Sequence, residues 1–138
     1  MSIDYPLLEQ IPEVAEYRAL RELAGLSTKT LEAAQLGLPN TLLAAVVRDG
    51  KQLIAMGRVI GDGGCNFEVV DIAVHPDYQR QGLGTRIMDS LMTRLRTIAP
   101  FSAYVSLIAD DHSPALYEKF GFRATTPRSI GMALRIED

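Results

Sequence analysis

The sequence has few of the cysteine and histidine residues that disulfides and metal sites require. It contains one cysteine, Cys65, and two histidines, His75 and His112. A single cysteine excludes an internal disulfide and a cysteine-rich metal site. The two histidines stand far apart in the sequence and no dense carboxylate cluster accompanies them, so we expect no metal site. Cys65, at the start of an expected strand, is interpreted as a small hydrophobic side chain.

The net charge is also small, and long apolar runs are lacking. The 138 residues carry a formal net charge of −3, so the composition does not favour nucleic acid as a partner. No apolar stretch approaches the ~20 residues that cross a bilayer, and the N-terminus lacks the basic start and apolar run of a signal peptide. We therefore expect a cytoplasmic protein that does not use a membrane. At this length, with 47% hydrophobic residues, the chain fits one domain over residues 1–138.

The pattern of apolar residues and turn residues predicts a mixed α/β protein. Asp49-Gly50 is a strong hairpin signal between two aliphatic segments, and Gly61-Asp62-Gly63-Gly64 marks the next turn. Strands are expected at 3–5, 41–48, 51–60, 65–74, 102–109 and 130–136, with a further short strand allowed at 122–125. Helices are expected from Pro12 to Gly25, from an N-cap at Ser27 to residue 36, at 82–98, and from an N-cap at Ser113 to residue 120. Antiparallel hairpins thus come first and a β-α-β crossover second, which predicts a mixed, mostly antiparallel sheet with helices on both faces.

A glycine-containing loop at 79–85 joins an expected strand to an expected helix. Gly82 and Gly84 allow the main chain to approach a bulky anion closely. A helix begins here, so several backbone N–H groups are unpaired and the positive end of the helix dipole points at the loop. The loop therefore predicts a phosphate-bearing ligand.

These residues carry a family resemblance. Gln79-Arg80-Gln81-Gly82-Leu83-Gly84 resembles the Gln/Arg-x-x-Gly-x-Gly/Ala signature of the GNAT superfamily of N-acetyltransferases. Residues 71–76 (Asp-Ile-Ala-Val-His-Pro) are similar to the family's fourth strand. Residues 116–122 (Leu-Tyr-Glu-Lys-Phe-Gly-Phe) resemble its Leu-Tyr-x-x-x-Gly-Phe segment. The resemblance covers the second half of the chain specifically. It implies the GNAT acyltransferase fold and direct acetyl transfer from acetyl-CoA to an amine, with no metal.

The resemblance also implies roles for particular residues. The loop would bind the pyrophosphate of acetyl-CoA, the main chain of the fourth strand would pair with its pantetheine arm, and the N–H of Val74 or its neighbour would meet the oxyanion. Tyr117 would be the general acid that protonates the departing thiolate, against the alternative of a core tyrosine. The expected cofactor-binding residues are Ile72, Ala73, Val74, Gln79, Arg80, Gln81, Gly82, Leu83, Gly84, Thr85 and Tyr117.

Two carboxylates are candidates for the general base that deprotonates the amine. Glu68 matches the position of the strand-borne glutamate in histone-type members of the superfamily, and Asp71 follows it on the same expected strand. In an unbroken strand the two side chains would point to opposite faces. The bulge that the resemblance implies in this strand would change that relation. Each carboxylate has the alternative role of a solvated or structural strand residue.

The sequence departs from the family at one place. Many relatives carry an asparagine before the tyrosine helix that helps to hold the cofactor, whereas this chain has Asp110-Asp111-His112-Ser113-Pro114. His112 or Ser113 is a candidate substitute, and His75 is interpreted as structural. The acceptor is expected to be a primary amine of a small molecule or peptide. The alternative is a non-catalytic acyl-CoA-binding or sensor module. A phosphotransferase is disfavoured because no lysine follows the glycines. A homodimer is expected from family habit.

Overall fold

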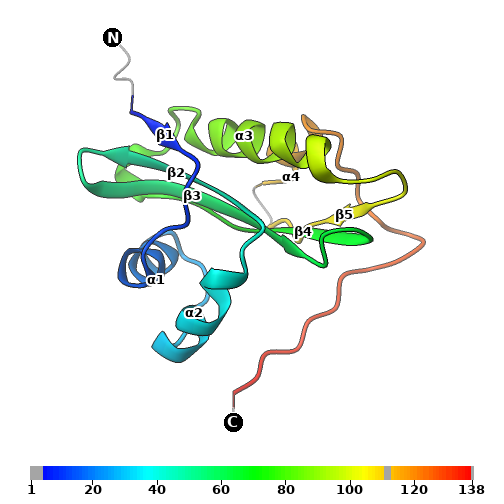
Figure 1. The fold of residues 1–138 in the computed structure, drawn as a ribbon, viewed down its shortest axis with the longest axis horizontal. Coiled ribbons are helices and arrows are strands. Elements are labelled where there is room, and N and C mark those ends of the chain that lie inside the picture. The colour runs from blue at the N-terminus through cyan, green and yellow to red at the C-terminus, as the bar shows by residue number, and fades with distance from the viewer. Residues whose placement is uncertain (1–4, 111–112, 138) are drawn as a thin grey trace.

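The structure, a computed structural model, describes residues 5–110 and 113–137. Its centre is a five-stranded sheet in the order β1-β2-β3-β4-β5, in which β5 alone runs parallel to its neighbour (Figure 1). The predicted mixed, mostly antiparallel sheet with helices on both faces is confirmed. The strands are β1 (Leu7–Leu8), β2 (Leu43–Asp49), β3 (Gln52–Gly61), β4 (Asn66–Val74) and β5 (Tyr104–Ser106). The helices are α1 (Val14–Leu23), α2 (Leu31–Gly37), α3 (Leu83–Ile98) and α4 (Pro114–Glu118), with 3₁₀ turns η1 (Leu38–Asn40) and η2 (Pro76–Tyr78).

Two hydrophobic layers hold the helices against the sheet. On one face, α1 and α2 bury Tyr17, Leu20 and Ala34 against strand residues that include Met56 and Ala73. On the other face, α3 buries a continuous stripe against β2, β3 and β4 (Figure 1). The helix predicted at 82–98 is found, and its Leu83, Ile87, Leu91, Met92 and Leu95 are all buried. No helix in the described part of the chain is long and apolar enough to cross a membrane.

The start of α2 differs from the prediction. Ser27 is not the N-cap, because its carbonyl and hydroxyl oxygens accept hydrogen bonds from Arg21 at 2.9 and 3.0 Å. Thr30 takes that role, and its Oγ1 accepts from the N–H of Ala33 at 3.0 Å. In the preceding helix Leu20 is buried, whereas Leu23 is exposed and Tyr17 and Arg21 are buried.

A β-bulge interrupts β4. Met56 pairs with Ala73 and Arg58 pairs with Val70, so three steps along β4 match two along β3. Asp71 lies in this extra stretch with a left-handed φ of 61°. Such a bulge re-aims the side chains that follow it. The bulge that the family resemblance implied is therefore present in the described structure.

Several strands differ from the prediction in their bounds. The expected strand at 3–5 lies largely outside the described residues, and the first strand is instead β1. The strand expected at 102–109 shortens to Tyr104–Ser106. Cys65 is exposed before β4 rather than packed as a small hydrophobic residue.

The predicted strands at 122–125 and 130–136 are wrong. Residues 122–137 contain no strand, and the chain runs away from the sheet after α4 (Figure 1). Apolar residues alternate with smaller or polar ones at 130–136, as in a strand, but they pair with no strand in the described part of the chain.

Candidate functional site

A cleft opens where β4 and β5 part. The two strands pair from Asn66 to Glu68 on β4 and from Tyr104 to Ser106 on β5, and β4 then continues to Val74 paired, among the described strands, with β3 alone. The cleft has a volume of about 150 Å³. Its lining comes from β4, the segment after β5, α4 and the α1–α2 loop: Glu68, Val69, Val70, Asp71, Ile72, Leu107, Ile108, Asp110, Tyr117 and Leu26. All three predicted catalytic residues therefore border one cleft.

The amino end of α3 presents unpaired donors beside this cleft. The N–H groups of residues 82–85 precede the first helical hydrogen bond, from Arg86 to the carbonyl of Gly82, and no side chain caps them. Gly82 has φ 77° and Arg80 has φ 64°, which turns the chain sharply into the helix. Four N–H groups at the positive end of a 16-residue helix match the oxygens of a phosphate.

Gly84 brings the first turn of α3 close to α4 and to the end of β4. A Cβ placed on Gly84 would lie 3.5 Å from Leu116 of α4 and 3.9 Å from Val74 of β4. The N–H donors thus lie next to the end of β4 and to the helix that carries Tyr117. A side-chain contact also holds the preceding loop, because Gln79 Nε2 lies 3.5 Å from the carbonyl oxygen of Val74.

His75 has a structural environment, as expected. Its backbone N–H donates to the carbonyl of Ile54 at 2.7 Å, and its Nδ1 accepts from the N–H of Asp77 at 3.1 Å. Its ring packs edge-on against Tyr78. These contacts anchor the start of the glycine-containing loop.

Tyr117 lies at the inner wall of the cleft with 8% of its surface exposed. Burial raises the pKa of its phenol above the ordinary value, and Asp110 raises it further, while Ser113 partly offsets both effects. Its ring meets Phe122 edge-on. The phenol therefore keeps its proton at neutral pH.

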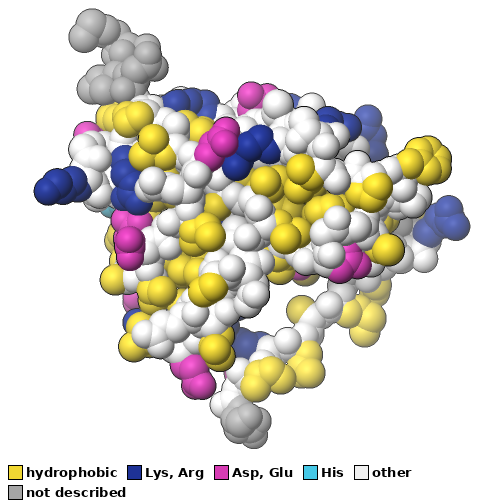
Figure 2. Space-filling model, in the orientation of Figure 1, with side chains coloured by type: hydrophobic (Ala, Val, Ile, Leu, Met, Phe, Trp, Pro, Cys, Tyr) yellow, Lys and Arg dark blue, Asp and Glu magenta, His cyan; other side chains and the backbone are white. Residues whose placement is uncertain are grey.

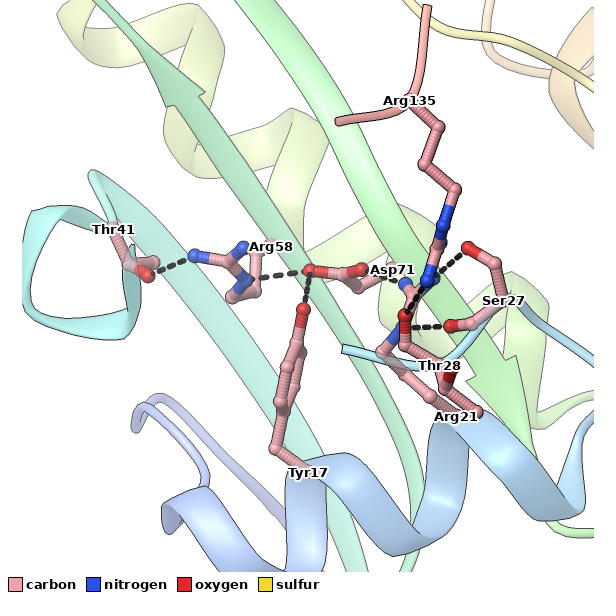
Figure 3. Close-up of polar contacts among 8 residues, drawn as sticks. All are labelled: Tyr17, Arg21, Ser27, Thr28, Thr41, Arg58, Asp71 and Arg135. Atoms are coloured by element: carbon pink, nitrogen blue, oxygen red, sulfur yellow. Dashed lines mark hydrogen bonds and ion pairs between the residues drawn. The ribbon is translucent and has the colours of Figure 1, made fainter. Parts of the chain in front are cut away.

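Asp71 is enclosed by two arginines and a tyrosine (Figure 3). One carboxylate oxygen pairs with Arg21; the other accepts from Arg58 Nε at 2.7 Å and from the Tyr17 hydroxyl at 3.0 Å. The side chains of Asp71, Arg21 and Arg58 are 5%, 8% and 9% exposed. Arg58 also donates to Thr41 Oγ1 at 2.7 Å. This cluster joins α1 to β3 and β4.

Tyr17 shares the buried environment of this cluster. Burial raises the pKa of its hydroxyl, and the charge of Asp71 raises it further. Sequence reasoning missed Tyr17, Arg21 and Arg58 as partners of Asp71. One signal was available, because Arg58 is a charge within the otherwise apolar segment 53–60 and therefore required a buried counter-ion.

Glu68 differs from Asp71 in its contacts although both lie on the same side of the sheet. Phe67 and Val69 pack in the core under α3, so Glu68 points to the opposite face. Asp71 points to that face too because of the bulge. Glu68 is half-buried and has no hydrogen bond or ion pair with any described residue.

The segment before α4 is described in part. His112 lies outside the described residues. The Ser113 hydroxyl donates to the carbonyl of Asp110 at 3.0 Å, which orders the turn that leads to Tyr117. Within residues 5–110 and 113–137, no three His, Cys, Asp or Glu side chains gather as metal ligands.

Comparison with known proteins agrees with this geometry. The family model of the acetyltransferase (GNAT) domain matches residues 40–124. A probable acetyltransferase of meticillin-resistant Staphylococcus aureus has a crystal structure similar to this one, with 47% identity, a TM-score of 0.93, and coverage of 96% of this chain and 100% of that one. The ribosomal protein bS18-alanine N-acetyltransferase of Escherichia coli is 39% identical over 85 residues, which are 60% of this chain and 55% of that protein.

A third relative is the N-acetyltransferase ycf52 of Pyropia yezoensis. It is 28% identical over 111 residues, which cover 78% of this chain and 63% of that protein. The chain therefore spans less than two thirds of the length of these two curated relatives.

Proposed function

Because this chain belongs to the GNAT acetyltransferase family, we propose that it transfers the acetyl group of acetyl-CoA directly to a primary amine of a small molecule or peptide. The observation that carries the proposal is the meeting of Tyr117 and Glu68 at one cleft, beside the unpaired N–H donors of α3. A buried proton donor, a carboxylate and an anion cradle are the groups that acetyl transfer to an amine requires.

The glycine-containing loop suits the pyrophosphate. The four N–H groups of residues 82–85 have no acceptor of their own at the helix end, and Gly82 leaves open space where a Cβ would stand. Residues 79–81 add Gln79, Arg80 and Gln81 at the rim, of which Arg80 supplies a positive charge. The main chain of Ile72, Ala73 and Val74 lies beyond the β4–β5 pairing and would accompany the pantetheine arm like an added strand.

Acetyl-CoA supplies an acetyl group activated as a thioester. Glu68, through a water molecule, takes the proton that the substrate ammonium must lose before its nitrogen can attack the acetyl carbon. As the carbon–sulfur bond breaks, Tyr117 gives its phenolic proton to the departing sulfur. The attacking nitrogen loses a second proton to water as the amide forms, Glu68 passes its proton to solvent, and Tyr117 recovers one proton from solvent, so each turnover releases one proton.

Asp71 suits a positioning role better than that of the base. Both of its oxygens are taken by Arg21, Arg58 and Tyr17, so it has no oxygen aimed freely at an acceptor. Its negative charge is matched by the two guanidinium groups. Glu68 has no such partner among the described residues.

The acceptor is proposed to be cationic. Glu68 and Asp110 border the cleft with no described guanidinium or ammonium partner, and an ammonium group would be attracted to them. A relative acts on the alanine of ribosomal protein bS18, which supports a peptide amine as one member of the class.

The test is a free-thiol release assay with acetyl-CoA and paired acceptors. Each amine (an N-terminal alanine peptide, a lysine peptide, a polyamine and an amino sugar) is matched with its alcohol or N-blocked counterpart. We expect release with an amine and none with its matched counterpart. Binding of acetyl-CoA without release from any amine would favour the non-catalytic acyl-CoA-binding alternative, and absence of binding would contradict the loop assignment.

A further inference from the structure

The last residues of the chain form an extended arm, defined here as residues 129–137. Its apolar side chains alternate and face solvent, with exposures of 67% for Ile130, 85% for Met132, 88% for Leu134 and 80% for Ile136. In Figure 2 the arm carries a row of hydrophobic side chains and is separated from the body by an open gap. Exposing such a row of apolar side chains to water is energetically unfavourable.

The same chain has an open apolar groove at the edge of its sheet. The groove has a volume of about 750 Å³ and lies between α3, β5 and the segment after α4. Its apolar lining includes Met92, Leu95, Ala99, Val105 and Phe122. β5 is the last strand of the sheet and, among the described residues, pairs with β4 alone, so its outer edge has backbone groups without a strand partner there.

The arm does not turn back into its own groove. It leaves the groove at a turn in which Ser129 N–H donates to the carbonyl of Thr125 at 3.2 Å. It then runs to the α1–α2 loop, where Arg135 Nη2 donates to the carbonyl of Thr28 at 2.8 Å (Figure 3). Because α1 and α2 cover the face opposite α3, this contact holds the arm away from the groove that α3 borders.

We propose that two copies of the chain exchange their arms, each adding as a strand to the outer edge of the other's β5 and filling the other's groove. Residues 130–136 in extended form span roughly 23 Å, the length of an ordinary strand. The side chains of Ile130, Met132, Leu134 and Ile136 share one face of that strand and would enter the groove together. A reciprocal exchange uses each arm and each free edge once and therefore closes as a two-fold dimer.

The exchange would also support the candidate active site. Tyr117 lines both the groove and the cleft, so the partner's arm would pack behind it. This consequence rests on the proposed function, whereas the dimer itself does not. A monomeric chain that still releases thiol would overturn the dimer alone.

The first test measures the dimer dissociation constant by sedimentation velocity for the full chain and for Leu134→Lys. Losing one buried leucine weakens association about tenfold or more, and a dimer has two arms, so we expect about a hundredfold increase. The matched control is Leu36→Lys at the end of α2. Leu36 is also an exposed leucine, and we expect its replacement to leave the dimer dissociation constant unchanged. A monomeric parent chain, or equal constants for the parent chain and Leu134→Lys, would overturn the proposal.

The second test identifies whose groove each arm fills. In a Cys65→Ser background, Met132→Cys on the arm and Val105→Cys on the groove-facing side of β5 are made in separate chains, mixed, and oxidised. We expect a disulfide-linked dimer with one chain of each kind, which neither chain alone gives. With both cysteines in one chain, an internal disulfide in a monomer would show that the arm closes on its own groove. That result, or no cross-link in the mixture, would overturn the exchange.

Discussion

Replacing Asp71 by asparagine separates a structural anchor from a catalytic base. Asparagine keeps the size of the side chain and tolerates the left-handed φ of 61°, so the change removes charge with little effect on shape. It leaves Arg21 and Arg58, each less than a tenth exposed, without their shared counter-ion. Removing one partner of a buried ion pair costs about 3–5 kcal/mol. For a domain of this size that corresponds to a fall in Tm of roughly 10–15 °C.

The matched control is Glu68→Gln on the same strand. Glu68 has no partner among the described residues, so we expect the free energy of unfolding to change by less than about 0.5 kcal/mol. If Glu68 is the base, kcat falls by about a hundredfold or more. The Asp71→Asn variant should show the reverse: a large loss of stability in urea unfolding, with kcat of the folded fraction retained at low temperature. Asp71→Asn within about 1 kcal/mol of the parent, together with a lost kcat, would refute this division of roles.

Three further predictions follow from single positions. Tyr117→Phe should lower kcat about 10–100-fold with acetyl-CoA affinity unchanged; because burial raises the pKa of this phenol, the alkaline fall of kcat in the parent should begin only above pH ~10 and be absent in the variant. An unchanged kcat at every pH would remove Tyr117 as the acid. Gly82→Asp should weaken acetyl-CoA binding at least tenfold in calorimetry, because a negative charge enters the cradle. Gly82→Asn, which tolerates the same φ, should weaken it less, and equal effects would assign the loss to shape. Gly57→Ala should destabilise by about 1–3 kcal/mol in urea, since the new Cβ would lie 2.5 Å from Ile72 Cδ1. Gly37→Ala, with open space around it, should be neutral or stabilising, and a loss there as large as at Gly57 would contradict the packing argument.

The sequence predicted the parts of the fold that depend on local signals. The helix expected at 82–98 is found at Leu83–Ile98, because its apolar period and the glycine at its start lie within one segment. The hairpin signalled by Asp49-Gly50 was equally clear: Asp49 pairs with Gln52 across a two-residue turn, and Gly50 in that turn has the positive φ of 61° that such turns favour. The cleft residues Glu68 and Tyr117 came from motifs, and the fold brings the two motifs together.

The remainder depends on partners that are distant in the chain. Asp71 meets Arg21, which lies 50 residues away, and the bulge that aims it leaves little trace in local periodicity. Ser27 had the residue type of an N-cap but is used by Arg21 instead. For 130–136, the sequence suits a strand, but a local pattern does not indicate which strand would pair with it.

The most direct test of the central claim is a two-dimensional ¹H–¹⁵N NMR titration of the full chain with acetyl-CoA. The account predicts the largest chemical-shift changes at the amides of residues 82–85 and 72–74, and a smaller change at the amide of Tyr117. Residues of β1 and the exposed face of α1 should not change. Changes centred elsewhere, or no changes in a sample that releases thiol from an amine, would contradict the placement of acetyl transfer at this cleft.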